Sequence, residues 1–335
     1  MIKTEIILLC NNYIAPFQDI NLDFIQFNKL FATRSIAEHG LGFMINLYDT
    51  KDSNEWSFNL LKTIVFDTGS LNKSFLHNMD VRAYDPQIID EILISHWHYD
   101  HIGALYPLLE RIDKEIPVVC HESAKRERFF KRSKDVKNSD LEGKKREEIL
   151  PLLSVSKIVN QEPIDLKRIE ELKANVIFSK DPYVVFKDQG LKITLSGEIP
   201  RIHPEESFYN FFSLQGGTLQ KDMILDDKCL ILEFPEKIIV LNGCCHSGLM
   251  NTLDYVKTLT SKRISHVIGG FHMVGASEQR INKTLSFLEI FQDNYENLYL
   301  FPIHCTGDKF LSILQNKKNA KWKAFNASVG TVFSF

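Results

Sequence analysis

The sequence lacks several patterns that would assign the chain to a common class of protein. None of its six cysteines forms a Cys-x-x-Cys pair, so neither a zinc knot nor a thioredoxin-type redox motif is indicated. Six scattered cysteines in 335 residues do not resemble a disulfide scaffold, and we expect reduced thiols. A Gly-x-Ser-x-Gly segment is also absent, which argues against a serine hydrolase.

Long apolar runs and a strong charge of one sign are absent too. The amino-terminal run 6–10 has only five apolar residues, which is too short for a signal peptide or a membrane span. We therefore expect a cytoplasmic location and no membrane partner. A net charge of −3 provides no general attraction to nucleic acid, which we do not expect as a partner.

Short apolar runs typical of buried strands alternate with amphipathic segments typical of helices. With 44% apolar residues, the chain can bury a large core. The predicted strands are 4–10, 42–48, 62–67, 91–95, 117–120, 191–195, 229–234, 237–242, 265–269 and 297–302. The predicted helices are 71–78, 103–112, 249–260 and 277–292. This mixture is compatible with an α/β fold of two packed mixed sheets, although periodicity alone does not select that fold.

The sequence does contain a dense cluster of metal-binding side chains. Residues 96–101 read His-Trp-His-Tyr-Asp-His and directly follow an apolar run, 92–94. In an extended segment His96 and His98 point to the same side, and Asp100 and His101 lie on the turn that follows. Imidazole and carboxylate ligands suit zinc, iron or manganese, and two neighbouring metal positions could share this segment.

A His-x-His-x-Asp-His pattern at the end of a strand resembles the metallo-β-lactamase superfamily. The segments 243–248, 269–272 and 302–307 are similar to a subgroup often labelled 7,8-dihydropterin-6-methyl-4-(β-D-ribofuranosyl)aminobenzene 5′-phosphate synthase. The resemblance extends over most of the chain, from residue 35 to residue 308. It implies a single domain, 1–335, folded as a four-layer αββα sandwich of two mixed β-sheets, with one or two divalent metal ions. Zinc is favoured as the metal, and iron and manganese are alternatives.

The resemblance also implies the remaining ligands. His246 and His304 each follow a predicted strand and match positions where the subgroup carries histidine. On the family pattern, the first two histidines of the motif and one later histidine hold one metal. The Asp-His pair of the motif and the other later histidine hold the second. The implied ligands are His96, His98, Asp100, His101, His246 and His304.

The sequence departs from the superfamily pattern at two places. A bridging aspartate usually closes the strand before the last helical segment, where this chain has Cys244. Cys244 or Cys245 could supply a thiolate instead, or either could be a buried, inert cysteine. At 195–201 many relatives carry a Gly-His ligand, and this chain offers Glu198 and Arg201. We treat Cys244, Glu198 and Arg201 as candidate substrate-binding or supporting residues, and occupancy of the second metal position depends on them.

Two further residues have candidate roles. Asp67, in the segment 65–69, resembles a superfamily residue that usually supports the metal-binding loop. His272 follows a strand-like run and is expected at the same sheet edge, where it and Asp100 are candidate catalytic residues. We expect ordinary structural or surface positions for the remaining histidines, which are His39, His77, His121, His203 and His266.

Residues 124–175 interrupt the alternation of strands and helices. Within 125–150, ten Lys or Arg stand against six Asp or Glu, a local net charge of +4 in a chain that is otherwise −7. We predict an inserted, charged helical segment. It is either a cap whose basic residues attract a phosphorylated substrate or a solvated pair of charged helices.

Three functional hypotheses follow from these features. The leading one is a metal-dependent hydrolase that uses metal-bound hydroxide on a small phosphorylated or cyclic ester substrate, such as a phosphodiester. The second is a dihydropterin-transferring synthase in methanopterin-type cofactor biosynthesis, in which an aromatic cluster could line the pterin slot. The third is a non-catalytic metal or redox sensor that uses Cys244 and Cys245. All three allow an oligomer. The aromatic cluster consists of Phe208, Tyr209, Phe211 and Phe212.

Overall fold

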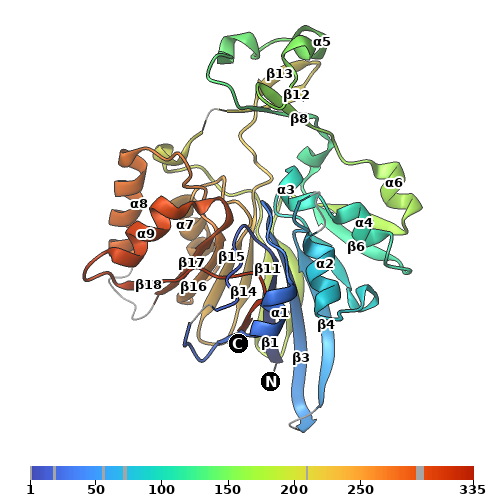
Figure 1. Cartoon of the computed structure of the whole chain (residues 1–335), viewed down its shortest axis with the longest axis vertical. Coiled ribbons are helices and arrows are strands. Elements are labelled where there is room, and N and C mark those ends of the chain that lie inside the picture. The colour runs from blue at the N-terminus through green and yellow to red at the C-terminus, as the bar shows by residue number, and fades with distance from the viewer. Residues whose placement is uncertain (1, 18–19, 55–56, 71–73, 209, 292–297) are drawn as a thin grey trace.

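Two large mixed β-sheets form the body of the protein in the computed structural model (Figure 1). The structure describes residues 2–17, 20–54, 57–70, 74–208, 210–291 and 298–335. The eight-stranded sheet has the order β2 (Ile25–Phe27), β19 (Thr331–Ser334), β1 (Ile2–Cys10), β3 (Gly42–Asn54), β4 (Ser57–Phe66), β5 (Glu91–Leu93), β6 (Ile116–Cys120) and β9 (Ala174–Phe178). The seven-stranded sheet has the order β10 (Tyr183–Asp188), β11 (Leu191–Leu195), β14 (Cys229–Glu233), β15 (Ile238–Asn242), β16 (Ile264–Gly270), β17 (Leu298–Ile303) and β18 (Trp322–Ala324).

The alternation of buried side chains along the strands shows that both faces of each sheet are covered. Successive residues of a strand point to opposite faces. In β1, Ile6 belongs to the apolar cluster between the sheets, and Ile7 belongs to the cluster under the helices. In β15, Ile239 faces the other sheet, and Val240 faces the helices on the opposite side. The predicted αββα sandwich is therefore confirmed.

Helices cover the outer face of each sheet (Figure 1). The eight-stranded sheet is covered by α2 (Ser74–Val81), α4 (Leu105–Leu109) and α6 (Leu166–Glu171). The seven-stranded sheet is covered by α7 (Leu249–Leu259), α8 (Glu278–Phe291) and α9 (Asp308–Asn316). The remaining helices of the described residues are α1 (Lys29–Arg34), α3 (Tyr99–Ile102) and α5 (Arg146–Ile149). Among the described residues, no helix has the length and apolar character needed to cross a lipid bilayer.

The predicted strands and helices of the body correspond to elements of the structure. The predicted helix 71–78 is found as α2, with residues 71–73 outside the described part of the chain. The predicted helix 103–112 is found as the shorter helix α4, which begins at Leu105, after the turn at Gly103 and Ala104 that separates it from α3. Residues 292 and 297, at the ends of two other predicted elements, also lie outside the described residues.

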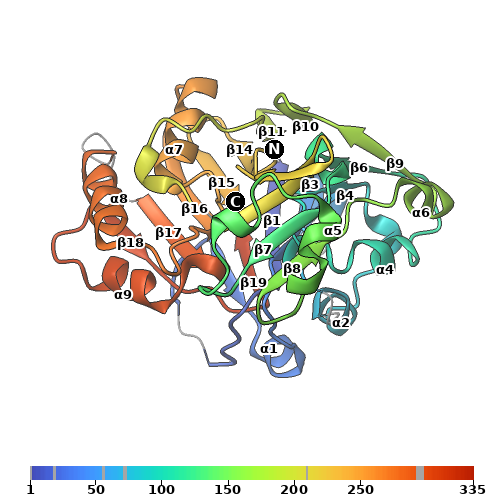
Figure 2. The same cartoon turned by 90° about the horizontal axis from the view of Figure 1, so that it is seen from above.

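A small third sheet stands above the body, where the helical insertion was predicted (Figures 1 and 2). Its four strands have the order β13 (Thr218–Lys221), β12 (Phe211–Gln215), β7 (Arg128–Lys131) and β8 (Ile158–Gln161). We call residues 128–161 and 211–221 the cap. The predicted helical insertion is correct only in part: the segment 124–175 contains the short helices α5 and α6, but it also supplies the strands β7 and β8 of this sheet. The pairing of β7 with β12 joins residues about 80 positions apart, and no local pattern indicates such a contact.

The cap has an apolar core of its own and a buried ionic anchor to the body. Phe129, Phe212 and Leu219 are fully buried in that core. The Arg128 guanidinium donates two hydrogen bonds to the Asp226 carboxylate, at 2.6 and 2.8 Å, and pairs with Asp222 at 3.1 Å. Because all three charged groups are buried, removing one partner would leave an uncompensated charge.

The separate core of the cap leads to a prediction about local stability. The substitution Leu219→Ala should leave a cavity in the cap and reduce its stability by about 2–5 kcal/mol, because the side chain is fully buried. Hydrogen–deuterium exchange should then rise in 128–161 and 211–221 but not in β15 and β16. Leu150→Ala, at an exposed position of the cap, is the matched control. An equal rise of exchange in β15 and β16 would show instead that cap and body unfold as one unit.

Candidate metal centre

The candidate ligands lie on loops that follow parallel strands. Asp67 follows β4, and His96 lies in the loop after β5, which runs parallel to β4. Cys244, His272 and His304 follow β15, β16 and β17, which are parallel neighbours in the other sheet. The carboxyl ends of parallel strands lie at one edge of a sheet, which is where α/β proteins bind ligands. Residues from distant parts of the sequence are thus brought together directly below the cap.

Three histidines form the first group. The ring centroids of His96, His98 and His246 lie 4.5–4.9 Å from one another. The Nε2 atom of His96 and both ring nitrogens of His246 are buried without a hydrogen-bond partner among the described residues. Buried polar atoms are rarely left unpaired, and a metal ion would use these lone pairs. The observation supports a metal position at this group.

A carboxylate and two histidines form the second group. Their ligand atoms and the Cys244 sulfur all lie within 4.8 Å of one another. The His304 Nε2 atom lies 3.3 Å from an oxygen of Asp100. The second group therefore consists of Asp100, His101 and His304, and the structure pairs His246 with the first group and His304 with this one.

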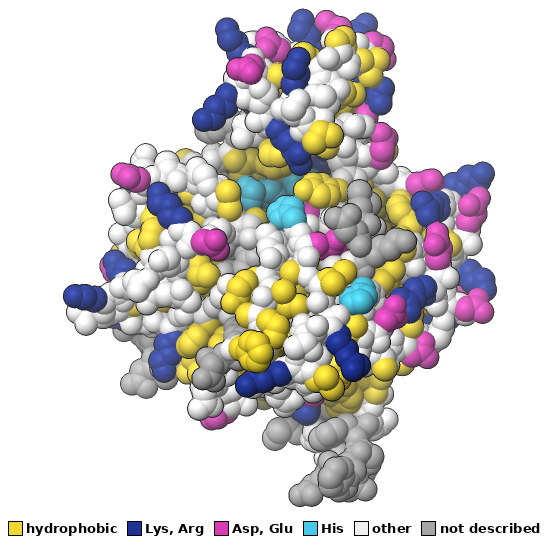
Figure 3. All heavy atoms as spheres, in the orientation of Figure 1, with side chains coloured by type: hydrophobic (Ala, Val, Ile, Leu, Met, Phe, Trp, Pro, Cys, Tyr) yellow, Lys and Arg dark blue, Asp and Glu magenta, His cyan; other side chains and the backbone are white. Residues whose placement is uncertain are grey.

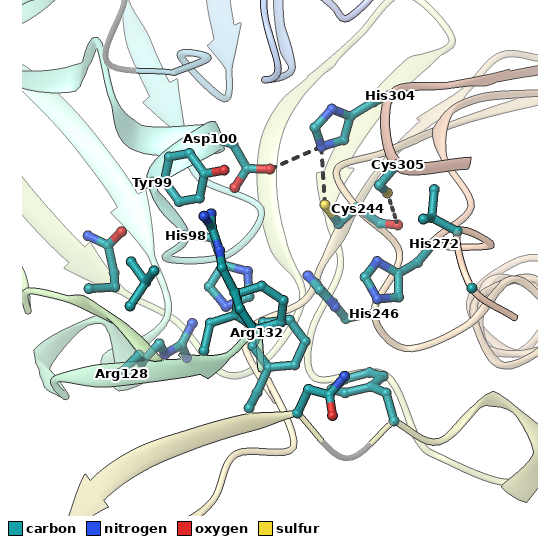
Figure 4. Close-up of a pocket in the computed structure, with 18 of the residues that line it drawn as sticks. His98, Tyr99, Asp100, Arg128, Arg132, Cys244, His246, His272, His304 and Cys305 are labelled. Atoms are coloured by element: carbon teal, nitrogen blue, oxygen red, sulfur yellow. Dashed lines mark hydrogen bonds and ion pairs between the residues drawn. The ribbon is translucent and has the colours of Figure 1, made fainter. Parts of the chain in front are cut away.

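Cys244 lies between the two groups (Figure 4). Its Sγ atom is 3.1 Å from His101 Nε2 and 3.3 Å from His304 Nε2, and it also lies within reach of His96 and His246. Cys245 points into the apolar core instead, with its sulfur 3.4 Å from Thr252 Oγ1. Of the two cysteines, Cys244 alone reaches both ligand groups, and the pair does not share one site.

Asp67 orients one histidine of each group through hydrogen bonds to the Nδ1 side of the ring, directly for His101 and through Ser95 for His96. Its carboxylate accepts hydrogen bonds from the Ser95 backbone N–H and hydroxyl, both at 2.7 Å, and from His101 Nδ1 at 2.7 Å. The Ser95 hydroxyl also lies 2.9 Å from His96 Nδ1. These contacts occupy the Nδ1 atoms and turn the Nε2 atoms of both histidines toward Cys244. Such supporting contacts fix the orientation of metal-binding histidines.

Burial and charge set the protonation of the histidines. Burial lowers the pKa of His96 and His246 well below the ordinary range, and neighbouring histidines lower both further. Burial, with the nearby Arg128 charge, lowers the pKa of His98 to about 3. Burial also disfavours charge on His101, but the Asp67 and Asp100 carboxylates outweigh it and raise its pKa to about 9. The three histidines of the first group are thus neutral and have free lone pairs.

The structure brings His272 and Arg201 to the site but not Glu198. The His272 ring lies 4.1 Å from that of His246, and its buried Nδ1 atom has no partner among the described residues. Arg201 donates to the backbone carbonyl of His246 at 2.5 Å and to two carbonyls at 223–224, so it holds the His246 loop. Glu198 accepts a hydrogen bond from His121 at 2.8 Å and does not line the cavity.

His39 and Asn12 lie at the site although no sequence signal indicated them. The His39 Nε2 atom is 3.3 Å from the Asp100 carboxylate, although we expected an ordinary structural or surface position. The Asn12 side-chain oxygen is 3.0 Å from His304 Nδ1 and therefore orients that ring. Both contacts join residues that are far apart in the sequence, and neither residue lies within a recognisable motif.

A cavity of about 610 Å³ opens above these groups, between the body and the cap. Figure 3 shows histidine side chains in this hollow, with apolar side chains around them. Phe211 stacks on His98 with the ring centroids 5.1 Å apart and on Phe130 at 4.8 Å. Phe208 also lines the cavity, 5.3 Å from the His246 ring. Of the predicted aromatic cluster, Phe212 instead lies in the cap core, and Tyr209 lies outside the described residues.

The position of Cys244 leads to a prediction about metal content. The substitution Cys244→Ser should weaken zinc binding at least about tenfold. Mutation of a residue that only hydrogen-bonds to a metal ligand already lowers metal affinity by about that factor, and loss of a ligand should cost at least as much. Elemental analysis and competition with a zinc chelator would measure the effect. Cys245→Ser is the matched control and should bind metal like the unchanged protein. Equal metal content in both variants would exclude Cys244 as a ligand.

Comparisons with known proteins agree with this geometry. Residues 61–201 match the family model described as the metallo-beta-lactamase superfamily. Two proteins of Methanocaldococcus jannaschii are each 28% identical to the chain. One, described as uncharacterized, covers 84% of this chain and 90% of its own. The other, named 7,8-dihydropterin-6-methyl-4-(beta-D-ribofuranosyl)-aminobenzene-5'-phosphate synthase, covers 82% of each.

A solved structure extends the comparison to the whole fold. The crystal structure of Tm1679, described as a metal-dependent hydrolase of the beta-lactamase superfamily, superposes with a TM-score of 0.66. The match covers 98% of each chain at 20% sequence identity. These findings confirm the resemblance inferred from the sequence motifs: the chain has the metallo-β-lactamase fold.

Proposed function

We propose that the protein is a metal-dependent hydrolase that acts on a small phosphorylated or cyclic ester substrate, such as a phosphodiester. The observation that carries the proposal is the meeting of two ligand groups at one sulfur atom, on the floor of a covered cavity. Buried imidazole nitrogens of His96 and His246 without hydrogen-bond partners give the first group free ligand atoms. A cavity of about 610 Å³ is the size of those that enclose small molecules.

The residues that would hold one or two divalent ions are His96, His246 and Cys244 on one side and Asp100, His101 and His304 with Cys244 on the other. The His98 ring lies 4.5 and 4.9 Å from the rings of His96 and His246 and would complete the first set. Imidazole and thiolate ligands favour zinc, with iron as the main alternative. Ions bound there would polarise the ester and lower the pKa of a bound water toward neutrality.

The side chains around the groups would complete the reaction site. His272 adjoins His246, lines the cavity and has an unpartnered Nδ1 atom, so it can donate a proton to the leaving oxygen. Burial disfavours charge on Asp100, but His101, His304 and His39 outweigh it and lower its pKa, so this carboxylate stays ionised and accepts hydrogen bonds. Phe208 and Phe211 exclude water from the cavity wall and would contact an apolar part of the substrate.

The hydrolase proposal predicts metal-dependent turnover of a chromogenic diester. The purified protein should release nitrophenol from bis(4-nitrophenyl) phosphate, and His98→Ala should reduce the rate by at least about 100-fold, because a lost ligand disables the metal. His203→Ala is the control, because that histidine pairs with Asp254 outside the cavity. A protein with full metal content that turns over none of a broad panel of esters and phosphoesters would contradict the proposal.

A second candidate is a dihydropterin-transferring synthase in methanopterin-type cofactor biosynthesis. The stacked rings of Phe130, Phe211 and His98 favour it, because a flat pterin ring can stack on such a wall. The name of one 28% identical relative points the same way. Transfer rather than hydrolysis would require water to be kept from the reacting carbon, which the cap can do.

Mass spectrometry separates the two candidates. The protein is incubated with a dihydropterin diphosphate and an aminobenzene ribosyl phosphate, and the products are weighed. A synthase should give the condensed product and release diphosphate, and Phe211→Ala should slow that reaction while leaving metal content unchanged. Hydrolysed dihydropterin with no condensed product would exclude the synthase and favour the hydrolase.

A further inference from the structure

A buried arginine lies in the cavity wall apart from the ligand groups. Arg280 is in the first turn of α8, is only 6% exposed and lines the cavity. Its Nε and Nη2 atoms are buried and have no hydrogen-bond partner among the described residues. An ionised group buried without partners is costly, so proteins usually keep one only where something else supplies the contacts. The open cavity is the side from which such contacts can come.

The acidic side chains near Arg280 are committed to other groups. The two carboxylate oxygens of Glu206 accept hydrogen bonds from the Met250 and Asn251 backbone N–H groups, at 3.0 and 2.9 Å. Glu205 lines the same cavity, and its carboxylate pairs with Lys283 at 3.8 Å. Within the described part of the chain, neither carboxylate is hydrogen-bonded to Arg280, so its donors remain available to a ligand.

The amino end of α8 adds a second feature that favours an anion. The positive end of the helix dipole lies at 277–280, and Ser277 lines the cavity beside Arg280. The Ser277 hydroxyl accepts the Arg280 backbone N–H at 3.2 Å and therefore caps the helix. Gly275 also lines the cavity, and a side chain there would meet nothing within 4 Å, so the backbone is accessible.

We propose that Arg280 and the amino end of α8 bind a phosphate group of the substrate, separately from the metal groups. This inference deepens the proposed function, on which it rests for the presence of a small substrate in the cavity. A guanidinium binds two phosphate oxygens at once, which matches the free Nε and Nη2 atoms. With Phe208 and Phe211 in the same cavity, the expected substrate class is a phosphomonoester carried on an aromatic group.

Calorimetric titration with phenyl phosphate tests the subsite. The full chain is titrated as purified and again after chelation of its metal, with phenol as the probe that lacks phosphate. Arg280→Gln should weaken phenyl phosphate binding at least about tenfold, because charge-assisted hydrogen bonds are lost, and should leave phenol binding unchanged. Arg280→Lys should give a smaller loss, because it keeps the charge without the paired donors. Lys309→Gln is the matched control, because it removes one positive charge from an exposed position of α9 outside the cavity wall.

Thermal unfolding separates a binding role from a structural one. Without ligand, Arg280→Gln should still unfold in one cooperative transition, although the buried Glu206 carboxylate loses a nearby positive charge. Phenyl phosphate should raise the Tm of the unchanged protein but not that of Arg280→Gln. Unchanged affinity in Arg280→Gln, or affinity lost on chelation alone, would overturn the subsite. Arg280-dependent binding in a protein without diester hydrolysis would uphold the subsite and contradict only the hydrolase proposal.

Discussion

The Asp67 carboxylate is the group on which the arrangement of the site depends. It joins the end of β4 to the candidate metal-binding turn through Ser95 and His101, and it is fully buried. Asp67 itself has a left-handed backbone, with φ of 58°, which its hydrogen bonds must hold in place. The other sheet reaches the same point through Gly243, where a Cβ would collide with the Ser95 hydroxyl and lie 3.1 Å from Asp67. Only a glycine allows this approach, and the next residue, Cys244, is thereby placed against His101.

The cap is tied to this arrangement by a second carboxylate. Asp226 accepts the Trp97 backbone N–H at 2.8 Å and also holds Arg128 of the cap. One buried group therefore contacts both the candidate metal-binding segment and the cap. We expect a shift of the cap to disturb the backbone between His96 and His98 and so to alter the geometry of the first group.

The sequence predicted the parts of the site that have local signals. Strands of the body show apolar runs, and His246 and His304 directly follow such runs, so their place at a sheet edge could be inferred. The cap sheet could not be inferred, because β7 is short and charged and pairs with strands far along the chain. The roles of His39 and Arg280 could not be predicted for a similar reason. His39 contacts Asp100, which is far away in the sequence, and Arg280 is distinguished only by its burial without hydrogen-bond partners for Nε and Nη2. Neither property can be read from neighbouring residues.

Cys244, proposed as the ligand where the superfamily usually has an aspartate, would change what the site can hold. A thiolate is a softer ligand than a carboxylate and favours zinc or iron over manganese. Burial raises the pKa of Cys244 well above the ordinary value, and the adjacent Cys305 and Asp100 raise it further. The thiol is therefore neutral unless a cation replaces its proton, and metal uptake must release that proton. An aspartate would already be ionised at neutral pH and would have no proton to lose. Only with a cysteine at this position would metal binding depend on replacing a proton by a metal ion.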